Sequence, residues 1–288
     1  MSHRLITINA DDLGLHEAVN EGIIRAHQDG VVTSASIIAC GRAFDDALIR
    51  CKSCPELDLG VHLTLVGERP LAPIEKVVSL VDEDGAMPPS YMPFAHAWLT
   101  GKIHATDIRL ELETQVARVL DNGIRPTHLD SHQHVHCLPG IWTMTLDIAK
   151  TYSIPFVRMP SFDSLWAEVK SPLVPLIRVT VNLLAILRQM VDMRPIRCVD
   201  KVRGSAFSGR LTTARLLSIL ETLRPGMTEI LVHPGIQNED LARRYGHWEF
   251  DWAAELRALT DALVITRCRR GDFTLTRFSE MKAFPQTI

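Results

Sequence analysis

The chain has 288 residues, of which 46% are hydrophobic and 23% charged, and its formal net charge at pH 7 is −3. This length and composition are those of a globular protein with one large domain. The slightly acidic charge and the aromatic content of 6% offer neither a basic field nor a stacking surface for nucleic acid. We therefore expect no nucleic-acid partner.

The amino-terminal residues and the cysteines indicate an intracellular setting. Met1 to Arg4 lead directly into an apolar strand, without the apolar segment and cleavage site of a signal peptide. The six cysteines are scattered, and Cys51 and Cys54 form a CxxC pair without a second pair. Such a lone pair is a weak zinc signal. We expect reduced thiols and a cytoplasmic location.

Short apolar runs alternate with segments of helical periodicity along the chain. Strands are expected at residues 5–9, 33–39, 58–65, 128–136, 156–159 and 228–233. Helices are expected at residues 17–29, 44–51, 107–122, 141–152, 212–223 and 252–262, and a last unit begins at 262–267. Residues 66–104 predict a lid loop and residues 161–204 an insertion with an apolar helix. This alternation predicts a single α/β domain over 1–288, with a parallel sheet and helices outside.

Polar residues stand at the carboxyl ends of the expected strands. They are Asp11 and Asp12, His62, His132, Arg158 and His233. Active sites of α/β barrels and of open α/β sheets lie at this edge. Because several strands contribute, we predict a closed or nearly closed barrel. Taken alone, Asp11 and Asp12 would also suit a helix N-cap, and His62 a hydrogen-bonded core histidine.

The densest motif is the segment 128–136. It carries a histidine or an aspartate at every second position: His128, Asp130, His132, His134 and His136. In an extended strand these side chains point to one face. Burying so many polar groups without partners costs several kcal/mol. The motif therefore predicts a metal or catalytic pocket, since imidazole and carboxylate are ligands of zinc and related divalent ions.

Several residues near this pocket have two interpretations. His134 and His136 are expected to orient the metal ligands rather than bind the ion. His128 and Asp130 would either orient His132 or fix the substrate. Arg158 would either form an ion pair with Asp11 or bind substrate.

The longest apolar stretch, residues 173–191, is interrupted by Arg178 and Arg188. Its uncharged runs are too short to span a bilayer, which needs about 20 apolar residues. A buried helix is the first expectation. Because basic residues flank the stretch, the alternative is a helix on a membrane surface or over the pocket mouth.

Four motifs together resemble those of the YdjC-like carbohydrate deacetylases, which include the chito-oligosaccharide deacetylases. They are NADDLG at 9–14, GVH at 60–62, THLDSHQHVH at 127–136 and VHPG at 232–235. Segments 30–36 and 204–207 are also similar, and the resemblance extends from about residue 4 to about residue 265. The insertion and residues 246–261 are more similar to the branch associated with hopanoid biosynthesis than to the chitobiose branch.

The resemblance implies a distorted (β/α) TIM-like barrel, one divalent metal ion (zinc or magnesium) and removal of acetyl from an N-acetylated sugar. By motif, Asp12, His62 and His132 would be the metal ligands, Asp11 the general base and His233 the general acid. The chemistry agrees, because a metal polarises an amide carbonyl, a carboxylate takes a proton from water and an imidazole protonates the leaving amine. Two adjacent aspartates of a regular strand cannot both face the metal, which fits a division into ligand and base.

Other functions stay open at the level of sequence. One is another barrel metallohydrolase, a phosphoesterase or an amidohydrolase, although an amidohydrolase would carry His-x-His where Asp11 and Asp12 stand. A second is a non-catalytic sugar- or lipid-binding protein, which would not require both Asp11 and His233. A third is an accessory protein of a membrane-bound pathway that docks through residues 173–191. A homodimer is the base-rate expectation for the oligomeric state.

Overall fold

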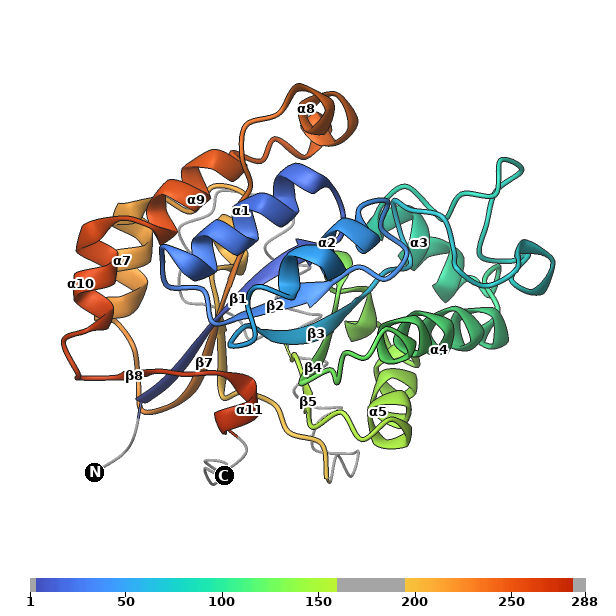
Figure 1. The fold of residues 1–288 in the computed structure, drawn as a ribbon. Coiled ribbons are helices and arrows are strands. Elements are labelled where there is room, and N and C mark those ends of the chain that lie inside the picture. The colour runs from blue at the N-terminus through green and yellow to red at the C-terminus, as the bar shows by residue number, and fades with distance from the viewer. Residues whose placement is uncertain (1–3, 160–194, 282–288) are drawn as a thin grey trace.

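The computed structural model describes residues 4–159 and 195–281, and its centre is a parallel sheet (Figure 1). The sheet within these residues has eight strands. They are β1 (Arg4–Leu13), β2 (Ser34–Ile37), β3 (Asp58–Leu63), β4 (His128–Ser131), β5 (Phe156–Val157), β6 (Lys201–Arg203), β7 (Gly226–Val232) and β8 (Thr274–Leu275). The predicted segment 173–191 lies outside the described residues.

The strands are ordered β5-β4-β3-β2-β1-β7-β6, and β8 pairs with the beginning of β1. The two outer strands approach each other, because Arg197, just before β6, forms a parallel bridge with Phe156 of β5. The amide of Val157 donates to the carbonyl of Arg197 at 2.9 Å, and the amide of Arg197 donates to the carbonyl of Pro155 at 2.8 Å. The predicted α/β fold with a distorted, barrel-like parallel sheet is confirmed.

Helices surround this sheet, with α1, α9 and α10 together at one end in Figure 1 and α4 and α5 at the other. The helices are α1 (Glu17–Gln28), α2 (Phe44–Cys51), α3 (Tyr91–Leu99), α4 (Ala105–Asp121), α5 (Ile141–Thr151), α7 (Thr213–Glu221), α8 (Glu239–Tyr245), α9 (Trp252–Leu259), α10 (Ala262–Cys268) and α11 (Phe278–Met281). No helix in residues 4–159 and 195–281 has the length and apolar content that a bilayer crossing requires.

The segment predicted as a lid loop has structure of its own and is tied to α4. It contains a 3₁₀ turn at Ile74–Lys76 and the helix α3. The buried carboxylate of Glu111 on α4 accepts hydrogen bonds from the amides of Leu71 at 3.0 Å and Ala72 at 2.8 Å. Asp107, one turn earlier, accepts from the amide and hydroxyl of Ser79. The inner face of α4 therefore anchors the segment through carboxylates, which hydrophobic patterning does not report.

The expectation of one extended strand over 128–136 was wrong. β4 ends at Ser131 and continues as a 3₁₀ segment, His132–Cys137. Gln133 and His134 have left-handed backbone conformations with φ of 53° and 56°. Two such residues in succession end the alternation of faces, so the five polar side chains of the motif do not share one face.

Candidate active site

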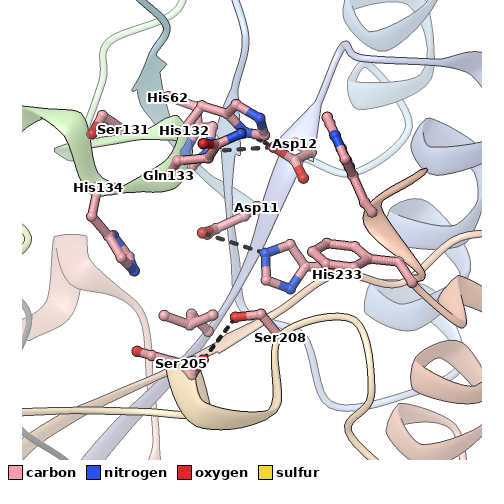
Figure 2. A pocket seen from close by; sticks show the side chains of 13 residues that line it. Asp11, Asp12, His62, Ser131, His132, Gln133, His134, Ser205, Ser208 and His233 are labelled. Carbon is pink, nitrogen blue, oxygen red and sulfur yellow. Dashed lines mark hydrogen bonds and ion pairs between the residues drawn. The ribbon is translucent and has the colours of Figure 1, made fainter. Parts of the chain in front are cut away.

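β1 ends in a bulge that turns two consecutive carboxylates into one cavity. In a regular strand Asp11 and Asp12 would point to opposite faces. The register between β1 and β2 shifts between Ala10 and Leu13, and Asp12 has a φ of 69°. A bulge re-aims a side chain in this way, so both carboxylates line the cavity (Figure 2). Left-handed backbone at a non-glycine residue costs about 1–3 kcal/mol and is typical of functional sites.

Asp12, His62 and His132 form a buried group whose ligand atoms lie within 4.8 Å of one another. Oδ1 of Asp12 is 2.9 Å from Nδ1 of His132 and 3.3 Å from Nε2 of His62. Oδ2 of Asp12 is buried and has no hydrogen-bond partner among the described residues. One carboxylate and two imidazoles with an unpartnered oxygen fit a divalent cation of the zinc type.

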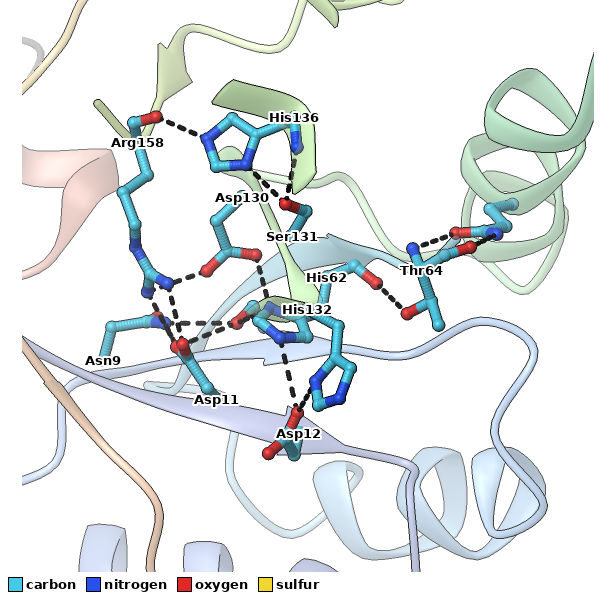
Figure 3. Close-up of polar contacts among 12 residues, drawn as sticks. Asn9, Asp11, Asp12, His62, Thr64, Asp130, Ser131, His132, His136 and Arg158 are labelled. Carbon is cyan, nitrogen blue, oxygen red and sulfur yellow. Dashed lines mark hydrogen bonds and ion pairs between the residues drawn. The ribbon is translucent and has the colours of Figure 1, made fainter. Parts of the chain in front are cut away.

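The orientation of His62 is set by Asp130 on the neighbouring strand (Figure 3). Nδ1 of His62 lies 2.8 Å from Oδ1 of Asp130 and 3.1 Å from Oγ of Ser36. Burial alone would lower the pKa of His62, but the nearby carboxylates, above all Asp130, raise it to about 10. Without a metal ion the ring therefore carries protons on both nitrogens at neutral pH. A metal ion at Nε2 would displace one of them, while the proton on Nδ1 stays directed at Asp130. Asp130 thus contacts His62, whereas the sequence suggested His132.

Asp11 is held by a buried guanidinium. Nη1 and Nη2 of Arg158 donate to the two carboxylate oxygens of Asp11 at 2.7 Å each. The same guanidinium contacts Asp130 at 2.7 Å and Glu229 of β7 at 2.6 Å. Burial favours the neutral carboxyl of Asp11, but Arg158 outweighs it and lowers the pKa. Asp11 therefore faces the cavity as an oriented carboxylate, and Arg158 forms the ion pair that was one of its two predicted roles.

His233 follows β7 and faces Asp11. Its Nε2 is 4.0 Å from Oδ2 of Asp11, and its Nδ1 is 4.0 Å from the buried carboxylate of Glu255 on α9. The backbone amide of His233 donates to the same carboxylate. Figure 2 shows Asp11 and His233 directed at each other. A carboxylate and an imidazole in this position, beside the Asp12 group, are able to exchange a proton with a common ligand.

The other three histidines of the motif have separate environments. His128 is buried away from the cavity and stacks on Phe278 with ring centroids 4.2 Å apart. His136 contacts the hydroxyl of Ser131 and, at 2.7 Å, the backbone carbonyl of Arg158. Of the three, His134 lines the cavity, and its Nδ1 has no partner among the described residues. Burial lowers the pKa of His134 to about 3, so the ring is neutral.

The cavity has a volume of about 330 Å³. Sequence reasoning missed a part of its lining: Ser131, Gln133, Ser205, Ser208, Leu231, Trp248 and Phe250. It also missed Glu229. A single carboxylate inside the apolar run of β7 was a usable signal for Glu229. Ser205, Ser208, Trp248 and Phe250 stand in loops and short 3₁₀ turns that carry no periodicity.

The chain belongs to the YdjC-like protein family, whose match covers residues 5–270. It is 32% identical over 272 residues to a carbohydrate deacetylase of Geobacillus stearothermophilus, covering 93% of this chain and 94% of that protein. It is 28% identical to one of Thermoanaerobacter pseudethanolicus, covering 97% and 100%. A solved structure from Enterococcus faecalis V583, described as a candidate protein for cellobiose-phosphate cleavage, has a TM-score of 0.78 at 26% identity and covers 97% of this chain and 99% of its own.

Proposed function

We propose that this chain is a carbohydrate deacetylase that removes the N-acetyl group of an amino sugar with the help of one divalent metal ion. The observation that carries the proposal is the presence, in one cavity, of the group Asp12, His62 and His132 beside the facing pair Asp11 and His233. The names of the relatives from Geobacillus and Thermoanaerobacter support the same reaction.

In this proposal Asp12, His62 and His132 hold the metal ion. When bound, a divalent ion supplies Lewis acidity, which polarises the amide carbonyl and makes water more acidic. Two imidazoles favour zinc over magnesium, which prefers oxygen ligands. Asp130 keeps the Nε2 of His62 available by binding the opposite ring nitrogen.

The residues around the ion complete the hydrolysis. Asp11 accepts a proton from the attacking water, whose oxygen forms a bond to the carbonyl carbon of the acetamide. Arg158 fixes the direction of the Asp11 oxygens. The side of Oδ2 that faces His233 stays available for proton transfer. His233 protonates the amide nitrogen as the carbon–nitrogen bond breaks, so acetate and a free amine leave. Because Asp11 and His233 are 4.0 Å apart, the proton taken up by Asp11 returns to His233 through a shared water molecule after each turnover.

A phosphoesterase is the rival left open by the sequence, and the description of the Enterococcus structure also names a phosphorylated sugar. A phosphorylated substrate calls for a cation beside its phosphate. The described residues that line the cavity include no lysine or arginine. The nearby Arg158 is already surrounded by three carboxylates, Asp11, Asp130 and Glu229. Besides the proposed metal ion, the described lining therefore offers a phosphate no cation, which supports the neutral acetamido group over a phosphate.

The test is acetate release from N-acetylglucosamine conjugates, free, oligomeric and lipid-linked, with zinc or magnesium. We expect Asp11→Asn to retain the metal and to lose a factor of about 10²–10⁴ in rate, the usual contribution of a general base. Asp12→Asn should lose both metal binding and acetate release. Asp84→Asn, an exposed aspartate of the 66–104 segment, is the matched control. Absence of acetate from every conjugate, or full activity of Asp11→Asn, would contradict the proposal.

A further inference from the structure

One wall of the cavity is aromatic, and the hydrolysis described above does not use it. Trp248 and Phe250, which we call the aromatic wall, follow α8 and line the cavity. The ring centroid of Trp248 is 5.0 Å from that of His132 and 5.7 Å from that of Phe250. The ring of Phe250 is 5.0 Å from that of His233. The wall therefore runs from a proposed metal ligand to the proposed general acid.

The loop that carries the wall is anchored on both sides. Glu249, between the two aromatic residues, has a left-handed φ of 55°. The amide of Asp251 donates to the carbonyl of Gly209 at 2.7 Å. The hydroxyl of Tyr245, at the end of α8, donates to Glu68 of the 66–104 segment at 2.9 Å. Trp248 and Phe250 remain half-buried, so large apolar rings are kept in contact with the cavity instead of packing into the core.

Apart from Leu231, the remaining lining is polar. Nδ1 of His134 and Oγ of Ser205 are buried and have no hydrogen-bond partner among the described residues. Figure 2 shows His134 and Ser205 on the side of Asp11 away from His233, whose ring Phe250 contacts. Buried polar atoms without partners are rare in folded proteins. The cavity thus combines an aromatic surface with polar atoms that are available for hydrogen bonds to a ligand.

A pyranose ring has the complementary character, with apolar C–H groups on its faces and hydroxyl groups around its rim. The C–H groups carry a partial positive charge and are attracted to the negative face of an aromatic ring. We propose that Trp248 is the stacking platform for the sugar ring of the substrate, extended by Phe250, and that Ser205 and His134 bind its hydroxyl groups. This inference rests on the proposed function.

The size of the cavity adds a limit on the substrate. Its volume of about 330 Å³ is at the lower end of the range of about 300–1,000 Å³ for ligand pockets. A cavity of this volume accommodates one sugar ring with its acetamido group, so the remainder of a conjugate extends outside. The recognised unit is a single N-acetylated pyranose.

Calorimetric titration of the metal-loaded full chain with the methyl glycoside of N-acetylglucosamine tests the platform. The Asp11→Asn background prevents turnover of the ligand. We expect Trp248→Ala to weaken sugar binding about tenfold or more, as for truncation of a central aromatic anchor, and Trp248→Phe to weaken it less. Ser205→Ala should weaken it by the smaller factor of a single hydrogen bond. Trp98→Phe is the control, because Trp98 lies outside the cavity and donates to the carbonyl of Pro139.

A second titration with zinc alone separates stacking from a structural effect on His132. Unchanged zinc affinity in Trp248→Ala together with weakened sugar binding supports the platform. Sugar binding equal to that of the parent, or a parallel loss of zinc affinity, overturns it. If acetate is released but sugar binding does not depend on Trp248, the platform is overturned and the deacetylation is not. Sugar binding that depends on Trp248 without acetate release from any conjugate would support the platform and overturn the deacetylation.

Discussion

The buried guanidinium of Arg158 is shared by three buried carboxylates, those of Asp11, Asp130 and Glu229. Even with a proton on His62, which contacts Asp130, two positive charges face three buried carboxylates. Glu229 relieves this imbalance, because burial raises its pKa from 4.5 to about 7 although Arg158 acts in the opposite direction. Near neutral pH, Glu229 is therefore partly protonated and holds Arg158 without adding a full charge.

This arrangement predicts a pH dependence of stability that Glu229→Gln removes. The folded protein binds more protons at Glu229 than the unfolded chain between pH 4.5 and about 7. The free energy of unfolding therefore falls as pH rises through this window. Between pH 5 and pH 8 the free energy of unfolding should decrease in both proteins. We expect the decrease to be smaller in Glu229→Gln than in the parent, by up to about 3 kcal/mol.

Urea unfolding at the two pH values, with a chelator present, measures this difference. Glu83→Gln, an exposed residue of the 66–104 segment, should behave as the parent. An equal decrease in Glu229→Gln and in the parent would show that Glu229 does not titrate in this window.

The side chains that face the cavity were largely predictable, because parallel strands bring their carboxyl ends together. Asp11, Asp12, His62, His132 and His233 all line it. The environment of His136 was not predictable, since it depends on two left-handed residues after β4. That of His128 was not predictable either, because it depends on Phe278, which is distant in sequence. Periodicity assumes a regular backbone and cannot anticipate a strained one. The roles of all these residues in binding and catalysis stay predictions.

At the scale of elements, α1 and the turn after β7 meet through two glycines. A Cβ at Gly22 of α1 would lie 2.2 Å from the Cα of Gly235. This contact sets the turn that follows His233, so the close approach of a helix and a turn positions the proposed general acid.

Gly22→Ala should therefore lower both stability and activity. The methyl group would push the backbone of the turn outward, at a cost of about 1–3 kcal/mol typical of overpacking, although alanine is the better helix former. We expect a matching loss of unfolding free energy and a reduced rate of acetate release, with zinc affinity retained. Gly246→Ala is the control, since a Cβ there meets no atom within 4 Å. A Gly22→Ala protein as stable and active as the parent would contradict this account of the turn.

Most of the longer elements were predicted well, but α3, with nine residues inside the predicted lid loop, and the short strands were not. α2 was predicted with its observed bounds, and α4, expected at 107–122, spans Ala105–Asp121, because both have a clear apolar stripe. β6, of three residues, lies inside the predicted insertion, and β8 has two residues. Strands this short are defined by their neighbours in the sheet, which no local pattern reports.

At the scale of the whole molecule, the barrel-like closure was predicted from the number of strand ends that contribute polar residues. Its detail was not, because the bridge between Phe156 and Arg197 joins segments on either side of residues 160–194. The single domain over 1–288, the homodimer, the cytoplasmic location and membrane contact through 173–191 stay predictions.

The proposed metal ligands connect the centre of the sheet to one side of it. Asp12 belongs to β1, His62 to β3 and His132 follows β4. An ion held by these three would join segments more than a hundred residues apart in sequence, because Asp12 and His132 are 120 positions apart. Such an ion binds the folded chain in preference to the unfolded chain, so it shifts the folding equilibrium of the whole molecule.

We therefore expect zinc at about 100 times its dissociation constant to raise the free energy of unfolding by about 2.7 kcal/mol. Asp12→Asn should lose this gain, whereas Asp84→Asn should keep it. Thermal and urea unfolding with zinc and with chelator measure the effect without any substrate, so the result does not depend on the proposed reaction. Zinc stabilisation that persists in Asp12→Asn would place the ion elsewhere in the protein and would remove Asp12 from the proposed ligands.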